Sequence, residues 1–357
     1  MMIELPYGRK SLIFNIESKD NVTIKPPEKS LFMVNDIEKI IGRAIKNPLI
    51  NNQIEKDFDK KSIGIAINDH TRPLPYQLFL KPLIYLLEKN YGHPKKIDLF
   101  IAAGTHKPPS DIEIRAFIPE EIINNYPIAC HDCDKTENLV FLGFTSQKTP
   151  VYVNKCFFYS DIKIVIGNIE PHHFMGYSGG VKTAAIGLAG RETISKNHSF
   201  LSHPKAKMGL FKSNPMRMDV EEIGSMMGID YAFNIILDNK KNILASYWGD
   251  PFSVIECGIK FFIQNLQVNL DDHFHKYDLV IASPGGYPKD INLYQAQKAL
   301  THACFFAKPH SPIILTAECR EGFGNQTFKE FLEIFRSPSE VINAFEKMTF
   351  VIGPHKA

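Results

Sequence analysis

Short apolar segments alternate with longer segments of helical periodicity along this chain, and this alternation limits the possible folds more than any other feature. The segments Ser62–Ile67, Ile97–Ala102 and Lys163–Gly167 are rich in aliphatic residues and have the length of buried strands. Between the first two, Leu and Ile side chains recur at helical spacing from residue 78 to residue 87. Strand–helix–strand units of this kind predict an α/β fold with a mainly parallel sheet and flanking helices.

Two more strands are predicted towards the C-terminus, at Leu279–Ala282 and Ile313–Thr316, after a polar segment at residues 269–276. A chain of 357 residues is long enough for more than one hydrophobic core. We therefore predict an N-terminal domain over residues 1–270 and a smaller C-terminal α/β domain over residues 271–357, each with a mainly parallel sheet and flanking helices.

The composition excludes several classes of protein. The 41 Lys and Arg residues nearly balance the 39 Asp and Glu residues, so the chain lacks the basic field that a nucleic-acid partner would require. No apolar run approaches the roughly 20 residues of a membrane span, and the N-terminus lacks a signal-peptide pattern. Six cysteines are too few for a disulfide framework, and Cys130–Cys133 lacks the second pair of a zinc ribbon. We expect a cytoplasmic protein without nucleic-acid or membrane partners.

Polar loops follow three of the predicted strands, at residues 68–73, 103–109 and 168–183. Ligands bind at the carboxyl ends of strands in open α/β sheets, so we expect the three loops to converge on one crevice. Arg72 and the Gly179–Gly180 turn offer an anion a guanidinium group and backbone N–H groups. In any single loop such residues are typical of an ordinary turn, and it is the presence of three loops that favours a functional site.

Three histidine positions and one lysine stand out in this part of the chain. His106, either His172 or His173, and His198 each follow a loop marked by Gly or Pro, or lie near an expected helix end. Imidazole transfers protons near neutral pH and is also the commonest metal ligand. Lys182 lies next to glycines, where a lysine is either a covalent attachment point or an ordinary solvated side chain. These residues alone leave open both metal-assisted hydrolysis and acid–base chemistry on a small anion.

Six sequence blocks, taken together and in order, resemble the nickel-pincer lactate racemase family of 2-hydroxyacid racemases and epimerases. The blocks are Asp69–Pro73, Gly104–His106, Glu170–His172 with Gly176–Lys182, Asn197–His198, Asn292–Lys298 and Ala317–Gly324. Each block is modest by itself, but six in the expected order are specific, and they extend from about residue 60 to residue 325. The resemblance implies two α/β domains with the active site in the cleft between them. Because the family's second domain continues beyond residue 357, it also implies that residues 271–357 form an incomplete domain.

The resemblance implies a particular cofactor. This is a pyridinium-3,5-bisthiocarboxylic acid mononucleotide that holds nickel through carbon and sulfur and is covalently attached to a lysine, here Lys182. His198 would complete the nickel coordination beside the thioamide formed on Lys182, since imidazole and sulfur suit square-planar Ni(II). The residues implied to line the cofactor are Asp69, His70, Thr71 and Arg72. Cofactor-synthesis enzymes would be transient partners.

The implied reaction uses two bases and one hydride acceptor. One histidine removes the proton of the substrate hydroxyl while the hydrogen of carbon 2 leaves as hydride to the pyridinium ring, and the opposite histidine serves the other enantiomer. His106 and His172 match these bases. A helix predicted over residues 292–300 would place Tyr294, Gln295 and Lys298 on one face, where they would bind the substrate.

Lactate is the expected substrate, since the helical block matches the lactate-type pattern. Three alternatives stay open at this point. The first is a racemase or epimerase of a larger 2-hydroxy acid or sugar acid. The second is a hydrolase with zinc bound by His106, His172 and His198, and the third is an inactive protein that binds the nickel cofactor.

Overall fold

The chain forms two compact units, Lys29–Leu266 and a smaller unit made of Met1–Glu28 with Gln267–Ala357. The computed structural model describes residues 2–17, 36–50, 57–72, 74–238, 241–267 and 273–346. The predicted boundary between residues 270 and 271 lies outside these described residues. The two units differ from the predicted domains in one respect, because the N-terminal segment belongs to the smaller unit. None of the described helices has the length and apolar content needed to cross a membrane.

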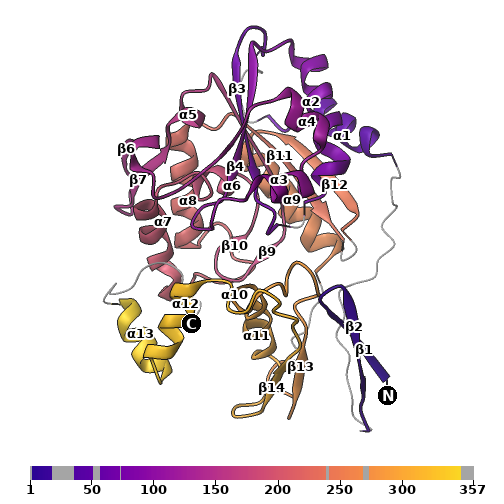
Figure 1. Ribbon diagram of the computed structural model, residues 1–357, viewed down its shortest axis with the longest axis vertical. Helices are drawn as coiled ribbons and strands as arrows, with labels where there is room; N and C mark the ends of the chain where they lie inside the picture. The colour runs from indigo at the N-terminus through magenta and orange to yellow at the C-terminus, as the bar shows by residue number, and fades with distance from the viewer. Residues whose placement is uncertain are drawn as a thin grey trace. The chain divides into compact units, whose positions relative to one another are not determined.

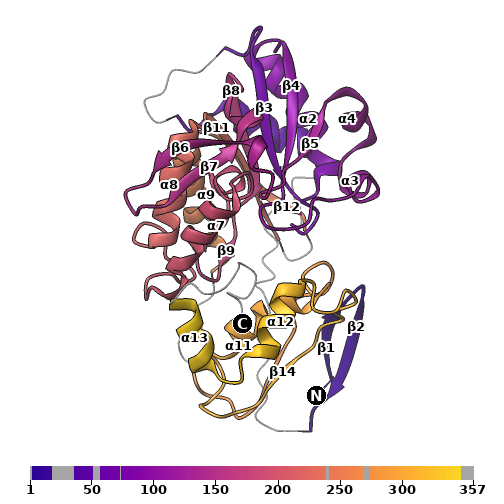
Figure 2. The ribbon, with the colours of Figure 1, turned by 60° about the vertical axis from the view of Figure 1, so that its left-hand side comes forward.

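A six-stranded sheet forms the centre of the larger unit, with the strand order β12–β11–β8–β3–β4–β5 (Figures 1 and 2). The strands are β3 (Ser62–Asn68), β4 (Lys96–Ala102), β5 (Ile128–Cys130), β8 (Ile162–Asn168), β11 (Tyr231–Leu237) and β12 (Ile243–Gly249). The first five of these run parallel to one another, and β12 runs antiparallel to β11 at the edge. This confirms the predicted α/β class with a mainly parallel sheet.

Side chains alternate between the two faces of this sheet, and each face has its own core. Ile65 of β3 and Leu99 of β4 pack with the helices α1 and α2, whereas Ala66 and Phe100 pack with α6, α8 and α9 on the other face. The helices are α1 (Ile37–Lys46), α2 (Tyr76–Tyr91), α3 (Asp111–Phe117), α4 (Glu120–Asn125), α5 (Lys155–Phe158), α6 (Lys182–Ala185), α7 (Arg191–His198), α8 (Pro215–Met227) and α9 (Pro251–Asn265). Smaller elements are the 3-10 turns Thr136–Asn138 and Ser199–Ser202, and the hairpins β6 (Leu139–Phe144) with β7 (Pro150–Asn154) and β9 (Pro171–His172) with β10 (Gly176–Tyr177).

The smaller unit combines the N-terminal hairpin with the C-terminal segment. Its elements are β1 (Met2–Tyr7), β2 (Lys10–Asn15), β13 (Val280–Ala282), α10 (Leu293–Ala296), α11 (Lys298–Ala303), β14 (Ile313–Leu315), α12 (Gln326–Ile334) and α13 (Pro338–Glu346). The strands β13 and β14 are parallel. The N–H of Gly8 donates to Oδ2 of Asp290 at 2.5 Å, and the hydroxyl of Ser283 donates to the carbonyl of Pro6 at 2.6 Å. These hydrogen bonds explain why the hairpin belongs to this unit.

Candidate active site

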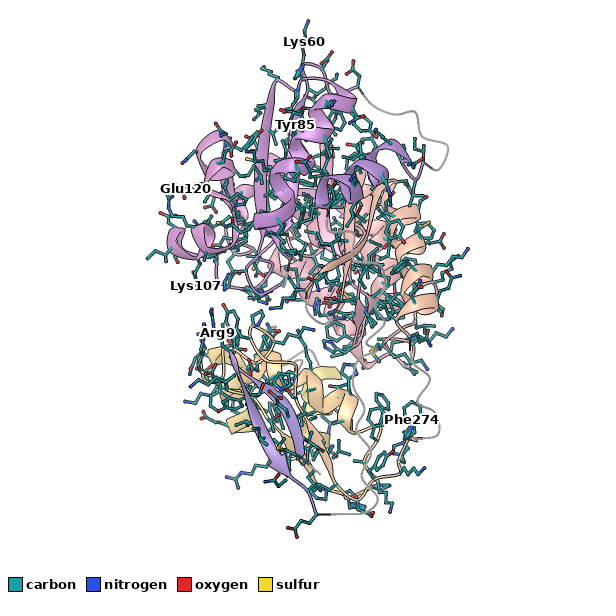
Figure 3. The ribbon with its side chains drawn as sticks, turned by 90° about the vertical axis from the view of Figure 1, so that its right-hand side faces the viewer. Arg9, Lys60, Tyr85, Lys107, Glu120 and Phe274 are labelled. Atoms are coloured by element: carbon teal, nitrogen blue, oxygen red, sulfur yellow. The ribbon has the colours of Figure 1, made fainter. Side chains whose placement is uncertain are left out.

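The carboxyl ends of β8, β3 and β4 lie side by side at one edge of the large sheet, because these strands are parallel neighbours. In Figure 3, Lys60 just before β3 and Lys107 shortly after β4 lie at opposite ends of the larger unit. The loops that follow the three strands therefore emerge together, as the sequence predicted. Asp69 meets His106 and so joins the first two loops. The N–H of Gly104 donates to the carbonyl of Gly187, which follows α6, at 2.9 Å.

Asp69 is the most strongly held side chain of these loops. It is only 3% exposed, and its carboxylate lies 2.6 Å from Nδ1 of His106. Thr71 donates to the same carboxylate through its hydroxyl at 2.6 Å and its N–H at 3.1 Å. Burial favours a higher pKa for Asp69, but the charge and hydrogen bond of His106, the charge of Arg72 and the bond from Thr71 outweigh it. The pKa therefore lies well below its ordinary value.

This ionised carboxylate fixes the ring of His106. A carboxylate only accepts hydrogen bonds, so Nδ1 of His106 donates and the lone pair of the neutral ring lies on Nε2. The same arrangement orients the base of a Ser-His-Asp triad. Sequence reasoning assigned Asp69 to cofactor binding and missed this contact. The only signal in the sequence was that Asp69 directly follows one predicted strand and His106 closely follows the next predicted strand.

The neighbours of Asp69 in its loop point in different directions. Nη1 of Arg72 donates to the hydroxyl of Thr71 at 3.2 Å. The ring of His70 lies near α3, with Nε2 at 3.9 Å from Glu113, and its buried Nδ1 has no hydrogen-bond partner among the described residues. Pro73, the last residue of this block, lies outside the described residues.

The hydrogen bond of His172 selects a different tautomer from that of His106. It lies on β9 opposite Gly176 of β10, and its ring stacks on His173 with a centroid distance of 4.6 Å. The N–H of Met175 donates to Nδ1 of His172 at 3.2 Å. Since Nδ1 accepts this hydrogen bond, the proton of the neutral ring lies on Nε2. His172 thus presents a donor where His106 presents an acceptor.

Lys182 is the first residue of α6 and follows a turn that requires glycine. Gly179 and Gly180 have φ angles of 91° and 59°, in the region that L side chains rarely adopt. A Cβ at Gly176 would lie 2.1 Å from the carbonyl oxygen of Leu210. Val181, directly before Lys182, is buried in the core against Gly224.

His198 ends α7 with a defined tautomer. Its Nδ1 lies 2.9 Å from the carbonyl oxygen of Ile194, so Nδ1 donates and the lone pair of the neutral ring lies on Nε2. Metal-binding histidines usually hold their other nitrogen on a carbonyl or carboxylate in this way. The preceding Asn197 donates to Asp219 at 2.8 Å and to the carbonyl of Met216 at 3.0 Å, which fixes this end of the helix.

The predicted substrate residues lie in the smaller unit. The helix predicted over residues 292–300 is divided into α10 and α11, with Gln297 between them. Nζ of Lys298 donates to Oε1 of Gln295 at 2.7 Å, so these two side chains do meet. The ring of Tyr294 packs edge-on against Phe328, with a centroid distance of 5.4 Å.

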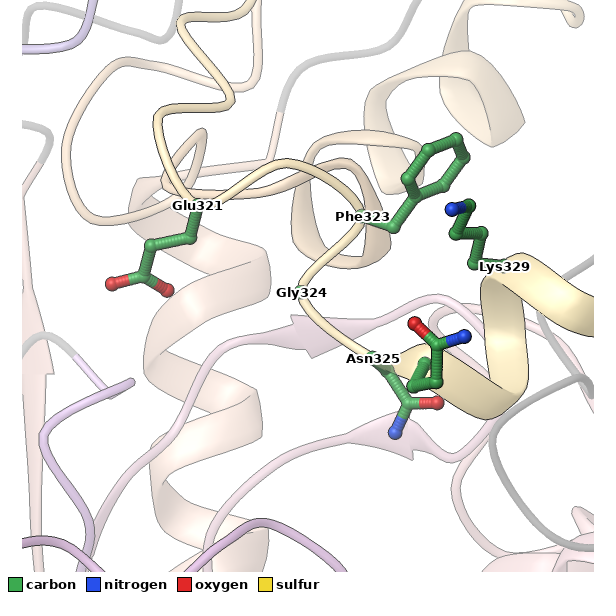
Figure 4. Close-up of a pocket in the computed structure, with 6 residues that line it drawn as sticks. Glu321, Phe323, Gly324, Asn325 and Lys329 are labelled. Atoms are coloured by element: carbon green, nitrogen blue, oxygen red, sulfur yellow. The ribbon is translucent and has the colours of Figure 1, made fainter.

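The loop before α12 supports the start of α10. The N–H groups of Leu293 and Tyr294 donate to the carbonyls of Gly322 and Phe323, at 2.9 and 3.2 Å. Beside this loop is a hollow of about 350 Å³ (Figure 4). It is lined by Glu321, Phe323, Gly324, Asn325, Gln326 and Lys329. None of the predicted substrate residues lines it.

The histidines do not form a zinc site. Within the described part of the chain, Asp132, Cys133 and Asp134 are the only three His, Cys, Asp or Glu residues that bring ligand atoms within 4.8 Å of one another. Of these, Asp134 is held by Arg191 at 2.5 and 2.7 Å, and burial raises the pKa of Cys133 to about 11, which disfavours a thiolate ligand. The geometry therefore does not support the zinc hydrolase alternative.

Comparisons with known proteins agree with the resemblance found in the sequence. Two family models match, described as the lactate racemase N-terminal domain over residues 7–209 and the lactate racemase C-terminal domain over residues 273–350. The lactate racemase of Thermoanaerobacterium thermosaccharolyticum is 30% identical over 345 residues, and that of Lactiplantibacillus plantarum is 29% identical over 346 residues. Each match covers 96% of this chain and 80% of the relative.

Solved structures are similar as well. The lactate racemase apoprotein from T. thermosaccharolyticum superimposes with a TM-score of 0.85 at 27% identity, covering all of this chain and 84% of the other. A crystal structure of a Thermotoga maritima protein has a TM-score of 0.67 at 18% identity, covering 90% of this chain and 80% of that one, and supports the fold alone.

Proposed function

Because this chain belongs to the lactate racemase family, we propose that it interconverts the two enantiomers of lactate with a nickel-pincer mononucleotide attached to Lys182. One observation carries this proposal: Nδ1 of His106 lies 2.6 Å from Oδ2 of the buried Asp69. The contact gives a histidine a fixed orientation at the carboxyl end of a central strand, and a base for the substrate hydroxyl needs such an orientation.

The donor groups of this chain fit the proposed cofactor. His198 holds Nδ1 on the carbonyl of Ile194, so its lone pair is on Nε2, the nitrogen that would bind nickel. Imidazole combined with sulfur suits square-planar Ni(II). Lys182 follows glycines whose lack of a side chain allows the backbone to approach a bound group closely. Thr71 and Arg72 are the residues that we propose to contact the cofactor from the loop after β3.

When bound, the cofactor supplies a pyridinium ring that takes up the hydrogen of carbon 2 with its electron pair and returns it. His106 removes the hydroxyl proton through Nε2, and the carboxylate of Asp69 stabilises the imidazolium that results. This role explains why Asp69 is buried and ionised beside the ring.

The second enantiomer presents its hydroxyl on the opposite side, so it requires a second base, which we assign to His172. His172 can accept a proton at Nε2 only while its own proton lies on Nδ1. The hydrogen bond from the N–H of Met175 to Nδ1 must therefore open during each catalytic cycle.

Gln295 and Lys298 are proposed to bind the substrate carboxylate. The 2.7 Å contact between them orients the ammonium of Lys298, and an ammonium beside a carboxylate is favourable in a site shielded from water. Tyr294 packs on Phe328 and would hold α10 in place for this purpose. The predicted location of the site between the two domains stays a prediction.

The test is to produce the protein together with the nickel-pincer biosynthetic enzymes and to measure both its mass and the racemisation of L-lactate. We expect a mononucleotide-sized adduct on the Lys182 peptide and conversion of L-lactate to D-lactate. His106→Ala and His172→Ala should each abolish racemisation and keep the adduct, whereas Lys182→Ala should lose the adduct. Full activity in either histidine variant would contradict the two bases. Racemisation of a larger 2-hydroxy acid but not of lactate would change the substrate.

A further inference from the structure

A fully buried arginine contacts the loop that leads into Lys182. Arg217 lies on α8, which packs against α6 (Figure 1). Its Nη1 donates to the carbonyl of Tyr177 at 3.1 Å, and its Nη2 donates to the carbonyl of Gly179 at 3.0 Å. Its Nε donates to Glu221 at 2.7 Å, which supplies the opposite charge. Because a guanidinium is unfavourable in a protein interior without such partners, its position is closely specified.

Asn234 holds the same loop from the central sheet. It is a buried residue of β11, and its Oδ1 accepts the N–H of Gly180 at 2.6 Å. A Cβ at Gly179 would lie 2.8 Å from this Oδ1, and a Cβ at Gly180 would lie 2.8 Å from Nη2 of Arg217. The glycine turn and the two buried side chains therefore fit as one packed unit.

The hydrogen bonds of Arg217 are made to protein groups on all three of its nitrogens, so it is not placed to bind a substrate. Its hydrogen bonds to the loop end at Gly179, only three residues before Lys182. We propose that Arg217, together with Asn234, is a positioning residue: it fixes the direction in which the Lys182 amine leaves the loop and thereby controls attachment of the cofactor. This inference rests on the proposed attachment at Lys182.

Substitutions at Arg217 separate positioning from general stability. Arg217→Met removes the hydrogen bonds to the loop, and Arg217→Lys keeps the charge but cannot hold two carbonyls in a planar fork. Thr145→Val is the matched control, because the hydroxyl of Thr145 donates at 2.6 Å to Asp219, a buried residue of the same helix, without touching the glycine turn. Arg217→Met and Thr145→Val each remove buried hydrogen bonds made by residues of α8, but only Arg217→Met removes hydrogen bonds to the glycine loop.

Two readouts apply to the cofactor-free protein. The first is the rate at which a trace of acetic anhydride labels the Lys182 amine at one fixed pH, relative to the surface residue Lys60. The second is hydrogen exchange of the Gly180 N–H. In Arg217→Met we expect faster exchange at Gly180 and a changed labelling rate at Lys182 relative to Lys60. Arg217→Lys should show part of both effects, and Thr145→Val should show neither, even if its melting temperature falls equally.

A third readout is the adduct formed when each variant is produced with the cofactor-synthesis enzymes. Displacement of a reacting group by about 1 Å can slow a reaction roughly 100-fold, and we expect a loss of initial attachment rate of this order in Arg217→Met. If Arg217→Met does not fold, Glu221→Gln is the second variant. It weakens the ion pair that holds Arg217, at a partly exposed position, and should also lower the initial attachment rate.

The inference would be overturned if folded Arg217 and Glu221 variants showed the same Lys182 labelling and the same rate of cofactor attachment as the parent protein. An equal loss in Thr145→Val would overturn it too, because the effect would then be one of stability. If the parent protein itself acquires no adduct, the proposed function fails, and the labelling and exchange of the cofactor-free variants still decide whether Arg217 positions Lys182.

Discussion

Replacing Asp69 with Asn tests the central contact of the site, because Asn keeps the shape of the side chain and removes its charge. The carboxylate accepts Nδ1–H of His106 at 2.6 Å in a buried position. Hydrogen bonds to charged groups contribute about 1.5–3 kcal/mol. If the only effect of the substitution is that the imidazolium of His106 loses this stabilisation, kcat/KM should fall roughly 10- to 150-fold.

A second effect adds to the first. The amide of Asn can donate to Nδ1, which would move the proton of His106 to Nε2 and leave the ring unable to accept the substrate proton. In Ser-His-Asp enzymes the equivalent change lowers kcat about 10⁴-fold. We therefore expect kcat/KM of Asp69→Asn to fall between about 10-fold and about 10⁴-fold.

The assay is the initial rate of racemisation, followed by chiral chromatography from each enantiomer and divided by the cofactor content measured by mass spectrometry. Because the two enantiomers have equal free energies, kcat/KM must fall equally in both directions. Thr71→Val is the comparison variant: Thr71 is also proposed to contact the cofactor, but this change keeps the carboxylate of Asp69, so kcat/KM per bound cofactor should fall less than in Asp69→Asn. Unchanged kcat/KM per bound cofactor in Asp69→Asn would refute the reasoning, and a loss of cofactor alone would assign Asp69 to cofactor binding instead.

Three further outcomes are expected. Lys298→Met should raise KM for lactate at least tenfold with a smaller effect on kcat, as loss of a charge-assisted hydrogen bond of about 1.5 kcal/mol implies, and steady-state kinetics measure this. Burial lowers the pKa of His131, so the unfolded chain binds more protons below about pH 6.5 and stability falls as the pH drops further. His131→Gln should weaken that dependence in thermal unfolding scans, and an unchanged slope would exclude His131 as its source. Burial raises the pKa of Cys133 to about 11, so at about pH 8 iodoacetamide should modify it far more slowly than the exposed Cys156.

The sequence was most informative where a local pattern decides the structure. The predicted strands at Ser62–Ile67, Ile97–Ala102 and Lys163–Gly167 match β3, β4 and β8 to within one residue at each end. Short runs of aliphatic residues bounded by polar loops have few alternatives to a buried parallel strand. The convergence of the polar loops followed from the same pattern.

Features that depend on distant contacts could not be read from local patterns. Asp69 and His106 are 37 residues apart, and they meet only because β3 and β4 are neighbours in the sheet. The place of the N-terminal hairpin depends on the bond between Gly8 and Asp290, which are 282 residues apart. The division of the predicted helix at Gln297 has no Gly or Pro to signal it.

The hairpin of β1 and β2 also fixes an order of events during synthesis. Gly8 is translated before its hydrogen-bond partner Asp290, which follows 282 residues later. All of Lys29–Leu266 has been translated by then, and domains generally fold as units while the chain grows. The part of the protein that carries Lys182 and Arg217 can therefore fold before the N-terminal strands reach their place, because their partner Asp290 is translated later.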